Sequence, residues 1–366
     1  MCQTAFHRHS IFCILPPHIL RSIAQNGTPQ QRAAAMHTLG ADNTLRTLRA
    51  SVRGLLPAAA QLRARVQVEA QKRRTIYNAH NTNNLPGDMV RSEGAPPSGD
   101  VAVDEAYDGL GATFDFYDKI FGRNSIDDKG MPLDASVHFR HEYNNAFWDG
   151  ERMVFGDGDG EVFNRFTISL DVIGHELTHG VTQAEAELVY SFQSGALNES
   201  ISDVFGSLIK QYALRQTAAQ ADWLIGAGLL TNKVHGVALR SMKAPGTAFD
   251  DKLLGKDPQP AHMKDFSVTF EDNGGVHINS GIPNHAFYLV ATRLGGYAWE
   301  KAGRIWYETV RDPRLNPVSG FRQFAGLTCL NAGRLFGKDS AEQRAVHEGW
   351  ASVGIEVEAE QPVLTA

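Results

Sequence analysis

The sequence predicts an α+β protein of two lobes, a β-rich first lobe followed by a helical second lobe. Within residues 77–160, short runs of alternating character such as Arg152–Phe155 are separated by turn-forming stretches. From Leu170 onward the period changes, and apolar residues such as Ile173 and Leu177 recur at helical spacing. At 366 residues, 42% of them hydrophobic, the chain is long enough to pack both lobes, with a cleft where they meet.

The individual elements follow from the same patterns. Strands are expected at residues 136–140 and 152–155, and the glycine-rich run at 156–160 is interpreted as a hairpin turn. Before the β-rich lobe, a Pro-Pro turn at 16–17 precedes a helical pattern over residues 29–48. Helical patterns begin with Leu170 to Val181, the helix that joins the two lobes, and continue over residues 197–212, 281–294, 298–310, 319–336 and 340–353.

Composition excludes several classes of protein. Charged residues make up 21%, too few for a disordered polyelectrolyte or a coiled coil. No apolar run reaches the roughly 18 residues that a membrane span needs. The three cysteines do not have the spacing of metal ligands, so we interpret them as small buried or tolerated side chains.

Charge divides the chain unevenly. Residues 1–74 hold 11 basic and 2 acidic residues, a balance of +9, and the remaining 24 basic and 39 acidic residues give −15, for the net −6. A basic head on an acidic body is typical of a nucleic-acid arm, a membrane-surface segment or a removable pro-segment. Because the basic residues are scattered and few aromatic residues lie between them, we expect no nucleic-acid partner.

The N-terminus does not predict a clear export signal. Its apolar run at residues 11–15 is short and is broken at once by Pro16 and Pro17, unlike the core of a Sec signal peptide. We expect a secreted or exported protein without a clear Sec signal, with the cytoplasm as the alternative.

The strongest motif is His175-Glu176-Leu177-Thr178-His179. On a helix, residues four apart lie on one face, so both imidazoles can reach one metal ion. Glu176 lies beside them, where it can take a proton from a metal-bound water. Zinc would lower the pKa of that water to about 7 and polarise a carbonyl group. The alternative is a helix whose histidines face solvent.

A third ligand is expected in the stretch 198–203. Catalytic zinc takes three protein ligands and leaves a fourth position to water. Glu199 and Asp203 are four apart on a predicted helix. We expect Glu199 to bind the metal and Asp203 to orient a ligating histidine from behind. A helix with a solvated acidic face is the alternative interpretation.

Amide hydrolysis also needs hydrogen-bond donors aimed at the oxyanion that forms. His277 can supply one if a carboxylate such as Asp272 keeps its ring oriented and protonated, and Tyr190 is a second candidate. A lone histidine or tyrosine is more often structural, so spacing alone leaves both roles open.

Taken together, these motifs resemble the thermolysin family of zinc metalloendopeptidases. Nineteen residues separate His179 from Glu199, as in that family, whereas zinc aminopeptidases with the same first motif usually have eighteen. The resemblance covers the body from about residue 74 to residue 354. Its motifs lie, in the family's order, at residues 143–150, 175–179, 195–203 and 274–281.

The resemblance implies a thermolysin-like two-lobed fold whose lobes are joined by the zinc-binding helix at the cleft. It implies three zinc ligands: His175, His179 and Glu199. Glu176 would be the general base, with Asp203 and Asn198 behind the ligands. Asp272 would orient the first of two oxyanion donors, which are His277 and Tyr190.

The resemblance also implies how substrate binds. Asn145 and the carbonyl of Ala146 would hold the peptide backbone extended, and Arg240 would bind the carbonyl beyond the scissile bond. An apolar pocket would be lined by Phe163, Phe166, Val172, Ile225 and Leu239. Cleavage on the amino side of Leu, Ile, Val or Phe is the expected preference, with Phe166 narrowing the pocket.

One departure from the family concerns calcium. Asp171 and Asp222 remain at the family's double calcium site, but Lys210, Leu224 and Ala227 occupy positions where acids are expected. An ammonium group repels a cation and can pair with the remaining carboxylates. We therefore predict no calcium there.

The head resembles that of a subgroup, the protealysin-like enzymes, which have a short pro-segment with a Pro-Pro-hydrophobic motif. Residues 16–20 match that motif. We expect residues 1–50 to form a pro-segment that covers the cleft as an intramolecular inhibitor, with Leu15 or Leu20 in the apolar pocket. Residues 51–185 would form the first catalytic lobe and residues 186–366 the second. The maturation cut stays open among bonds preceding Leu45, Leu48, Val52 and Leu55.

The function predicted is a monomeric zinc endopeptidase, made as a zymogen, that cleaves internal bonds of peptides and proteins. Two alternatives remain: a catalytically silent zinc-binding scaffold and a zinc aminopeptidase. The scaffold is disfavoured because Glu176, His277 and Tyr190 are all present, and the aminopeptidase is disfavoured by the ligand spacing.

Overall fold

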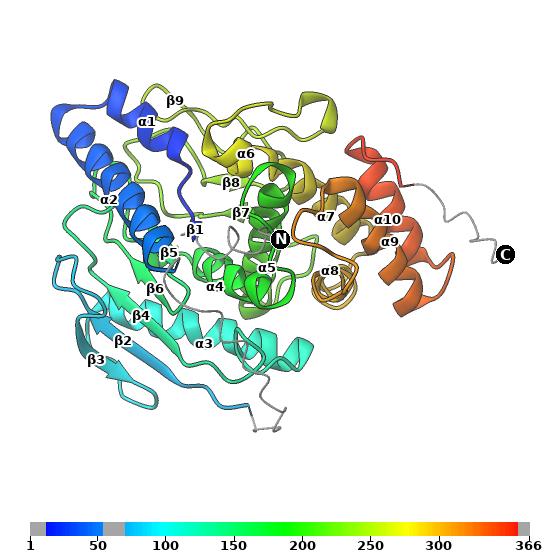
Figure 1. Ribbon diagram of the computed structural model, residues 1–366, viewed down its shortest axis with the longest axis horizontal. Helices are drawn as coiled ribbons and strands as arrows, with labels where there is room; N and C mark the ends of the chain where they lie inside the picture. The colour runs from blue at the N-terminus through cyan, green and yellow to red at the C-terminus, as the bar shows by residue number, and fades with distance from the viewer. Residues whose placement is uncertain (1–11, 54–69, 358–366) are drawn as a thin grey trace.

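The computed structural model describes residues 12–53 and 70–357. A mixed sheet and one long helix make up the first lobe, and helices make up most of the second (Figure 1). The α+β class and the two-lobed arrangement predicted from the sequence are confirmed. Among the described residues, no helix is long and apolar enough to cross a membrane.

The first lobe is built on a six-stranded sheet in the order β1-β5-β6-β4-β2-β3. β4 pairs in parallel with both β2 and β6, and the other neighbours are antiparallel. The bounds are Phe12–Cys13 for β1, Arg74–Asn78 for β2, Asp88–Ser92 for β3, Leu133–Val137 for β4, Ala146–Trp148 for β5 and Arg152–Phe155 for β6. β1 belongs to the N-terminal head, which thus supplies the edge strand of the sheet.

A 21-residue helix, α3 (Val101–Phe121), packs against this sheet, although the sequence analysis predicted only strands and turns in the region. Asp100 caps its first turn by accepting from two backbone N–H groups, and Gly122 ends it in the left-handed conformation. Gly109 weakens the helical pattern, and a side chain there would displace the side chain of Ile173 on α4. Close packing of two helices therefore explains the feature that concealed α3.

Two smaller predictions for this lobe also need correction. The strand expected at 136–140 is β4, which lies three residues earlier, at Leu133–Val137. The run 156–160 is a turn, but it does not join two strands of a hairpin. Instead Asp159 accepts hydrogen bonds from the backbone of residues 161, 162 and 163.

The helices that the periodicity predicted are present, with α4 joining the two lobes and the others in the second lobe. They are α4 (Leu170–Glu185), α5 (Phe192–Leu214), α7 (Gly281–Leu294), α8 (Ala302–Val310), α9 (Phe321–Phe336) and α10 (Ala341–Ser352). A short kinked helix, α6 (Asp272–Asn279), was not predicted. Between α5 and α6 lie two two-stranded sheets, β7 (Leu224–Ile225) with β8 (Arg240–Ser241) and β9 (Asp250–Asp251) with β10 (Gly255–Lys256).

Helices α4 and α5 cross at the centre of the molecule at close range (Figure 1). A side chain on Gly206 of α5 would lie 2.4 Å from the carbonyl oxygen of Asp171 and 3.0 Å from the amide nitrogen of His175. Only glycine allows the two backbones to approach this closely. The approach places the inner faces of both helices against each other.

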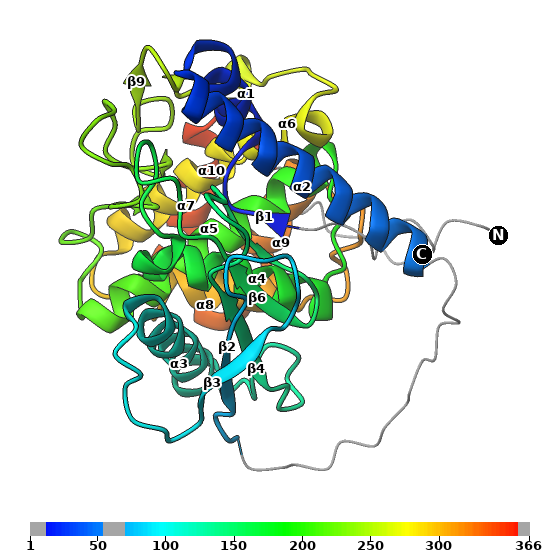
Figure 2. The ribbon, with the colours of Figure 1, turned by 90° about the vertical axis from the view of Figure 1, so that its left-hand side faces the viewer.

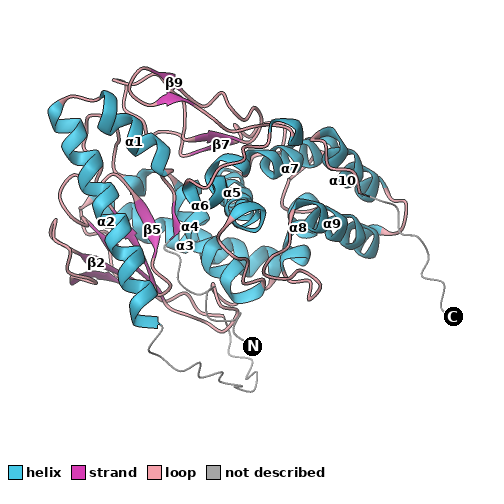
Figure 3. Ribbon diagram, turned by 45° about the horizontal axis from the view of Figure 1, so that its top comes forward, coloured by secondary structure: helices cyan, strands magenta, loops and turns pink. Residues whose placement is uncertain are grey.

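The N-terminal head folds as β1 and two helices, α1 (Pro17–Asn26) and α2 (Pro29–Arg53). The helix expected over 29–48 is confirmed and extends further, whereas only a turn was predicted where α1 lies. α1 begins at Pro17, a position where a backbone N–H would have no partner within the helix. It buries Ile19, Leu20 and Ile23. Figures 2 and 3 show α1 and α2 lying across the outside of both lobes.

A charged histidine connects the start of α3 to the turn after β6. One ring nitrogen of His138 lies 2.8 Å from Asp157 and the other lies 2.9 Å from Asp100. The hydrogen bond with Asp157 is the main cause that raises the pKa of His138 to about 9, against a smaller opposing effect of burial.

This pKa predicts how stability depends on pH. Because the folded pKa lies above the ordinary value of 6.5, the stabilisation is complete below about pH 6.5 and is lost as the pH rises through 9. His138→Gln should therefore destabilise the protein by about 1 kcal/mol at pH 6 and by little at pH 10. Denaturant unfolding of the variant at both pH values checks this. An equal effect at pH 6 and pH 10 would show that His138 is not charged in the folded protein.

Candidate active site

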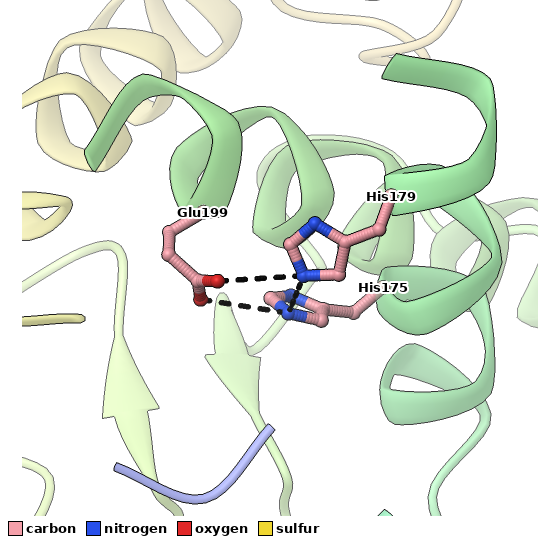
Figure 4. A group of neighbouring side chains, drawn as sticks. All are labelled: His175, His179 and Glu199. Atoms are coloured by element: carbon pink, nitrogen blue, oxygen red, sulfur yellow. Dashed lines mark hydrogen bonds and ion pairs between the residues drawn. The ribbon is translucent and has the colours of Figure 1, made fainter. Parts of the chain in front are cut away.

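Three buried side chains converge where α4 crosses α5. His175 and His179 project from one face of α4 toward Glu199 on α5 (Figure 4). Their Nε2 atoms are 3.0 Å apart, and they lie 3.6 Å and 3.4 Å, respectively, from the Glu199 carboxylate. The structure thus brings together the three residues predicted to bind a metal.

The Nδ1 atoms of both imidazoles, which face away from the common centre, also have hydrogen-bond partners. Asp203 lies 2.8 Å from His175 Nδ1, and Asn198 lies 2.8 Å from His179 Nδ1. Ser202, which the sequence analysis did not identify, lies 3.0 Å from His179 Nδ1. With Nδ1 so engaged, each ring directs Nε2 to the common centre.

The donor set fits zinc. Two imidazole nitrogens and one carboxylate are the ligands of many catalytic zinc sites. Burial lowers the pKa of His175 to about 4, which leaves its ring neutral at pH 7, as metal binding requires. Glu199 Oε2 is buried without a hydrogen-bond partner, which a metal ion would supply.

Glu176 lies on the same helix, between the two histidines in sequence. Its Oε2 atom accepts a hydrogen bond of 3.0 Å from the backbone N–H of Trp148 on β5, and its Oε1 atom has no hydrogen-bond partner. Burial, reinforced by the charge of Glu199, raises the pKa of Glu176 well above its usual range. The Trp148 N–H thus fixes the side chain by one oxygen, and the nearby backbone N–H of Ile14 in the head partly offsets the rise in pKa.

Three further residues predicted to take part in catalysis form a connected group with Glu199: Tyr190, His277 and Asp272. Tyr190 donates a hydrogen bond to Glu199, and its hydroxyl lies 3.2 Å from His277 Nε2. Asp272 lies 2.7 Å from His277 Nδ1 and also accepts from the His277 backbone N–H. Burial opposes the charge on His277, but the carboxylates of Asp272 and Glu199 outweigh it and raise its pKa to about 9.

Arg240 has a role that the sequence did not reveal. It forms a bidentate pair with Asp203, with distances of 2.9 Å and 2.7 Å, while Asn284 on α7 donates to the same carboxylate at 2.8 Å. Burial raises the pKa of Asp203, but Arg240 and His175 hold it at about 2. One buried carboxylate therefore orients both a predicted metal ligand and a predicted substrate-binding residue.

The five residues predicted to line an apolar pocket are all buried, and two pairs of them are in contact. All five are buried in the main apolar cluster, which also contains Ile14 of the head: Phe163, Phe166, Val172, Ile225 and Leu239. The ring centroids of Phe163 and Phe166 are 5.9 Å apart, and the backbone N–H of Leu239, next to Arg240 in the chain, donates to the carbonyl oxygen of Ile225.

The head contacts the residues predicted to bind substrate. The backbone N–H of Leu15 donates to the side-chain oxygen of Asn145 at 3.1 Å, and the Arg240 guanidinium donates to the carbonyl oxygen of Ile14 at 3.0 Å. From α2, Thr38 accepts from the backbone N–H of Asn144, and Asp42 accepts from Asn145 at 3.0 Å. No sequence signal marked Thr38 and Asp42, because their partners are about one hundred residues away.

Such a site, between a β-rich and a helical lobe, defines a zinc-dependent peptide hydrolase. Profiles of the thermolysin metallopeptidase family match the chain in two parts, the catalytic domain over residues 58–183 and the alpha-helical domain over residues 186–355. The chain belongs to this family.

Its relatives agree with that assignment. An "Extracellular metalloprotease" from Pectobacterium carotovorum is 54% identical over 96% of this chain and 98% of its own, and "Protease PrtS" from Photorhabdus is 50% identical over 95% and 93%. A solved precursor of protealysin, a metalloproteinase from Serratia proteamaculans, has a TM-score of 0.85 and 54% identity over 94% of this chain and 99% of its own. The chain is a zinc metalloendopeptidase with a pro-segment, and the scaffold and aminopeptidase alternatives are not favoured.

Because Asp203 contacts both Arg240 and His175, the Asp203→Asn variant should have two separate defects. The substitution leaves Arg240 buried without a countercharge, which should lower the free energy of unfolding by about 3–5 kcal/mol. It also weakens the orientation of His175, which should weaken zinc binding by about 10–100-fold. Both quantities are measured by denaturant titration and competition with a zinc chelator, in a Glu176→Gln background to prevent self-digestion.

Asn284→Ala is the matched control, because it removes one partner of Asp203 but leaves the charge pair intact. Its effect on stability should be smaller, about 1–3 kcal/mol. Asp203→Asn protein that binds zinc and unfolds like the parent would show that this carboxylate does not organise the site.

Proposed function

We propose that His175, His179 and Glu199 hold one zinc ion and that Glu176 is the general base for peptide-bond hydrolysis. The observation that carries this proposal is the convergence of three buried ligands beside a carboxylate whose Oε1 atom has no hydrogen-bond partner. When bound, zinc supplies a Lewis acid that polarises the scissile carbonyl and makes water a better nucleophile.

The remaining steps are carried out by the protein's own groups. Glu176 accepts the proton of the attacking water on Oε1, while the backbone N–H of Trp148 keeps Oε2 in place. The same carboxyl then delivers a proton to the leaving amine. His277 Nε2 and the Tyr190 hydroxyl donate to the oxyanion, and Asp272 holds the His277 ring in the orientation for this.

Substrate binds as an extended strand. Asn145 and the carbonyl of Ala146 at the start of β5 pair with the substrate backbone, and Arg240 donates to the carbonyl beyond the scissile bond. Because Asp203 fixes the Arg240 guanidinium in place, this donor needs little reorganisation when substrate arrives. The head's contacts with these same three residues support the assignment.

Specificity is assigned to the apolar pocket defined above by its five residues. Its walls are fully buried and carry no charge, so an aliphatic or aromatic side chain gains most by entering it. We propose cleavage on the amino side of Leu, Ile, Val or Phe, with Phe166 limiting the size of the side chain that fits.

Calcium is not part of this proposal at the family's double site. The Lys210 ammonium lies 2.7 Å from Asp171, 2.9 Å from Asp222 and 2.8 Å from the carbonyl oxygen of Leu224. These three contacts support the proposal, because an ammonium group among these oxygens repels a cation.

The head is proposed to be the enzyme's own inhibitor, with residues 1–50 as the pro-segment and lobes at 51–185 and 186–366. Its β1 strand and helices cover the cleft, and its basic charge complements the acidic body. Of the candidate maturation sites, Leu55 lies outside the described residues. The relatives' names support a protein that acts outside the cell, here as a monomer on peptide and protein substrates.

Digestion of a mixed peptide pool tests the proposal. The matured enzyme should make internal cuts before Leu, Ile, Val or Phe, and a zinc chelator should abolish them. Glu176→Gln should retain zinc but lose at least about 1,000-fold in kcat, because no group remains to move the proton. Mass spectrometry identifies the cuts.

The possible failures of this test differ in meaning. Removal of single residues from peptide N-termini would indicate an aminopeptidase. Zinc-loaded protein without any cuts would indicate a silent scaffold. A Glu176→Gln enzyme as active as the parent would require another base.

A further inference from the structure

The pro-segment enters the cleft as an extended strand. Phe12 and Cys13 form β1, which pairs antiparallel with β5 in the register Phe12 with Trp148 and Cys13 with Phe147. The pairing continues beyond the strand, since the backbone N–H of Ile14 donates to the carbonyl oxygen of Ala146 at 3.3 Å. The backbone around residues 13–15 is therefore held on one side by the first lobe.

The opposite side of this strand is held by the second lobe. His277 Nε2 lies 3.0 Å from the carbonyl oxygen of Cys13, and Arg240 donates at 3.0 Å to the carbonyl oxygen of Ile14. The carbonyl group of Cys13 is thus in contact with the proposed oxyanion donor. The next carbonyl group, that of Ile14, is in contact with the donor proposed to bind beyond the scissile bond. These are the positions that the carbonyl groups on either side of a bond about to be cut would occupy.

The direction of the chain is also that of a substrate. Along the strand, Cys13 contacts His277, the next residue, Ile14, contacts Arg240, and Leu15 contacts Asn145. The chain therefore runs from the proposed oxyanion donors toward the amide that is proposed to bind substrate. A pro-segment running the opposite way would place its carbonyls and N–H groups at other points along β5. The hydrogen bonds therefore place the Cys13–Ile14 peptide bond at the position of catalysis.

The side chain that follows this bond is of the type that the proposed pocket would accept. Like Leu15 and Leu20, Ile14 is buried in the large apolar core that also contains the five pocket residues, so the backbone hydrogen bonds, and not burial, choose among the three. Ile14 is one of the four residue types expected after a cut. The backbone hydrogen bonds thus assign this position to Ile14, and not to Leu15 or Leu20 as the sequence analysis expected.

The strand is anchored on its C-terminal side. Leu15, Ile19 and Leu20 are buried against the body, and Asp42 of α2 accepts from both Asn145 and Tyr143. These contacts hold the Cys13–Ile14 bond at a fixed place in the same molecule, where no diffusional encounter is needed.

We propose that the Cys13–Ile14 bond is a cleavage site that the enzyme hydrolyses in its own chain. Water adds to the carbonyl carbon of Cys13, the C–N bond breaks, and the products are a carboxylate on Cys13 and an amine on Ile14. The inference rests on the proposed function, because it uses the same base, donors and pocket. It assigns a processing site upstream of the maturation bonds considered above.

The test follows the intact precursor over time. The full chain is purified with chelator, cleavage is started with zinc, and samples are analysed by intact mass and N-terminal sequencing. A chain beginning at Ile14 and a peptide of residues 1–13 should appear, with a half-time that does not change over a tenfold range of protein concentration. Glu176→Gln precursor from the same host should show neither product.

Two variants of one position sharpen the test. Ile14→Leu should keep the cut, and Ile14→Asp should slow it at least about tenfold, because a carboxylate is excluded from an apolar pocket. Neither substitution is present in the matured enzyme, so activity on an external peptide serves as a matched control and should be equal for both.

Several results would overturn the inference. One is a sample that cuts the external peptide but never yields an Ile14 N-terminus, and another is a rate that rises in proportion to protein concentration. Unchanged cutting of Ile14→Asp would likewise contradict the placement of Ile14. If neither the external peptide nor the precursor is cut, it is the proposed function that fails.

Discussion

The site depends on one buried carboxylate, that of Asp203. It accepts from His175 on α4, from Arg240 on β8 and from Asn284 on α7, and it is fully buried on α5. A lone carboxylate would be strongly destabilising at this depth, and so would a lone guanidinium. Together they neutralise each other, and their geometry fixes a proposed metal ligand and a proposed substrate-binding donor relative to one another.

The crossing of α4 and α5 makes this arrangement possible. Gly174 and Gly206 let the two helices approach so closely that a side chain at either position would clash with the opposite helix. At that distance, side chains four apart on α4 and the Glu199 side chain on α5 meet at one point. The metal site is thus a consequence of helix packing, and the same packing buries the polar groups that orient it.

How much the sequence could reveal follows from how far apart the interacting residues lie. His175 and His179 are one helical turn apart, so their spacing alone predicts a metal site, and the periodicity predicts α7 to the residue. The Asp203–Arg240 pair joins residues 37 apart, and Asp42 meets Tyr143 across 101 residues. No local pattern marks such contacts. The helix α3 was missed because Gly109 and Gly111, which let it pack closely, also weaken its helical signal.

The central claim is that two imidazoles and one carboxylate hold the metal while the pro-segment strand lies in the cleft. Zinc X-ray absorption spectroscopy of the Glu176→Gln precursor tests it most directly. The account predicts one zinc per chain with nitrogen and oxygen ligands at about 2.0–2.2 Å and no sulfur ligand. A sulfur ligand at about 2.3 Å would contradict it, because Cys13 would then have replaced one of the proposed ligands.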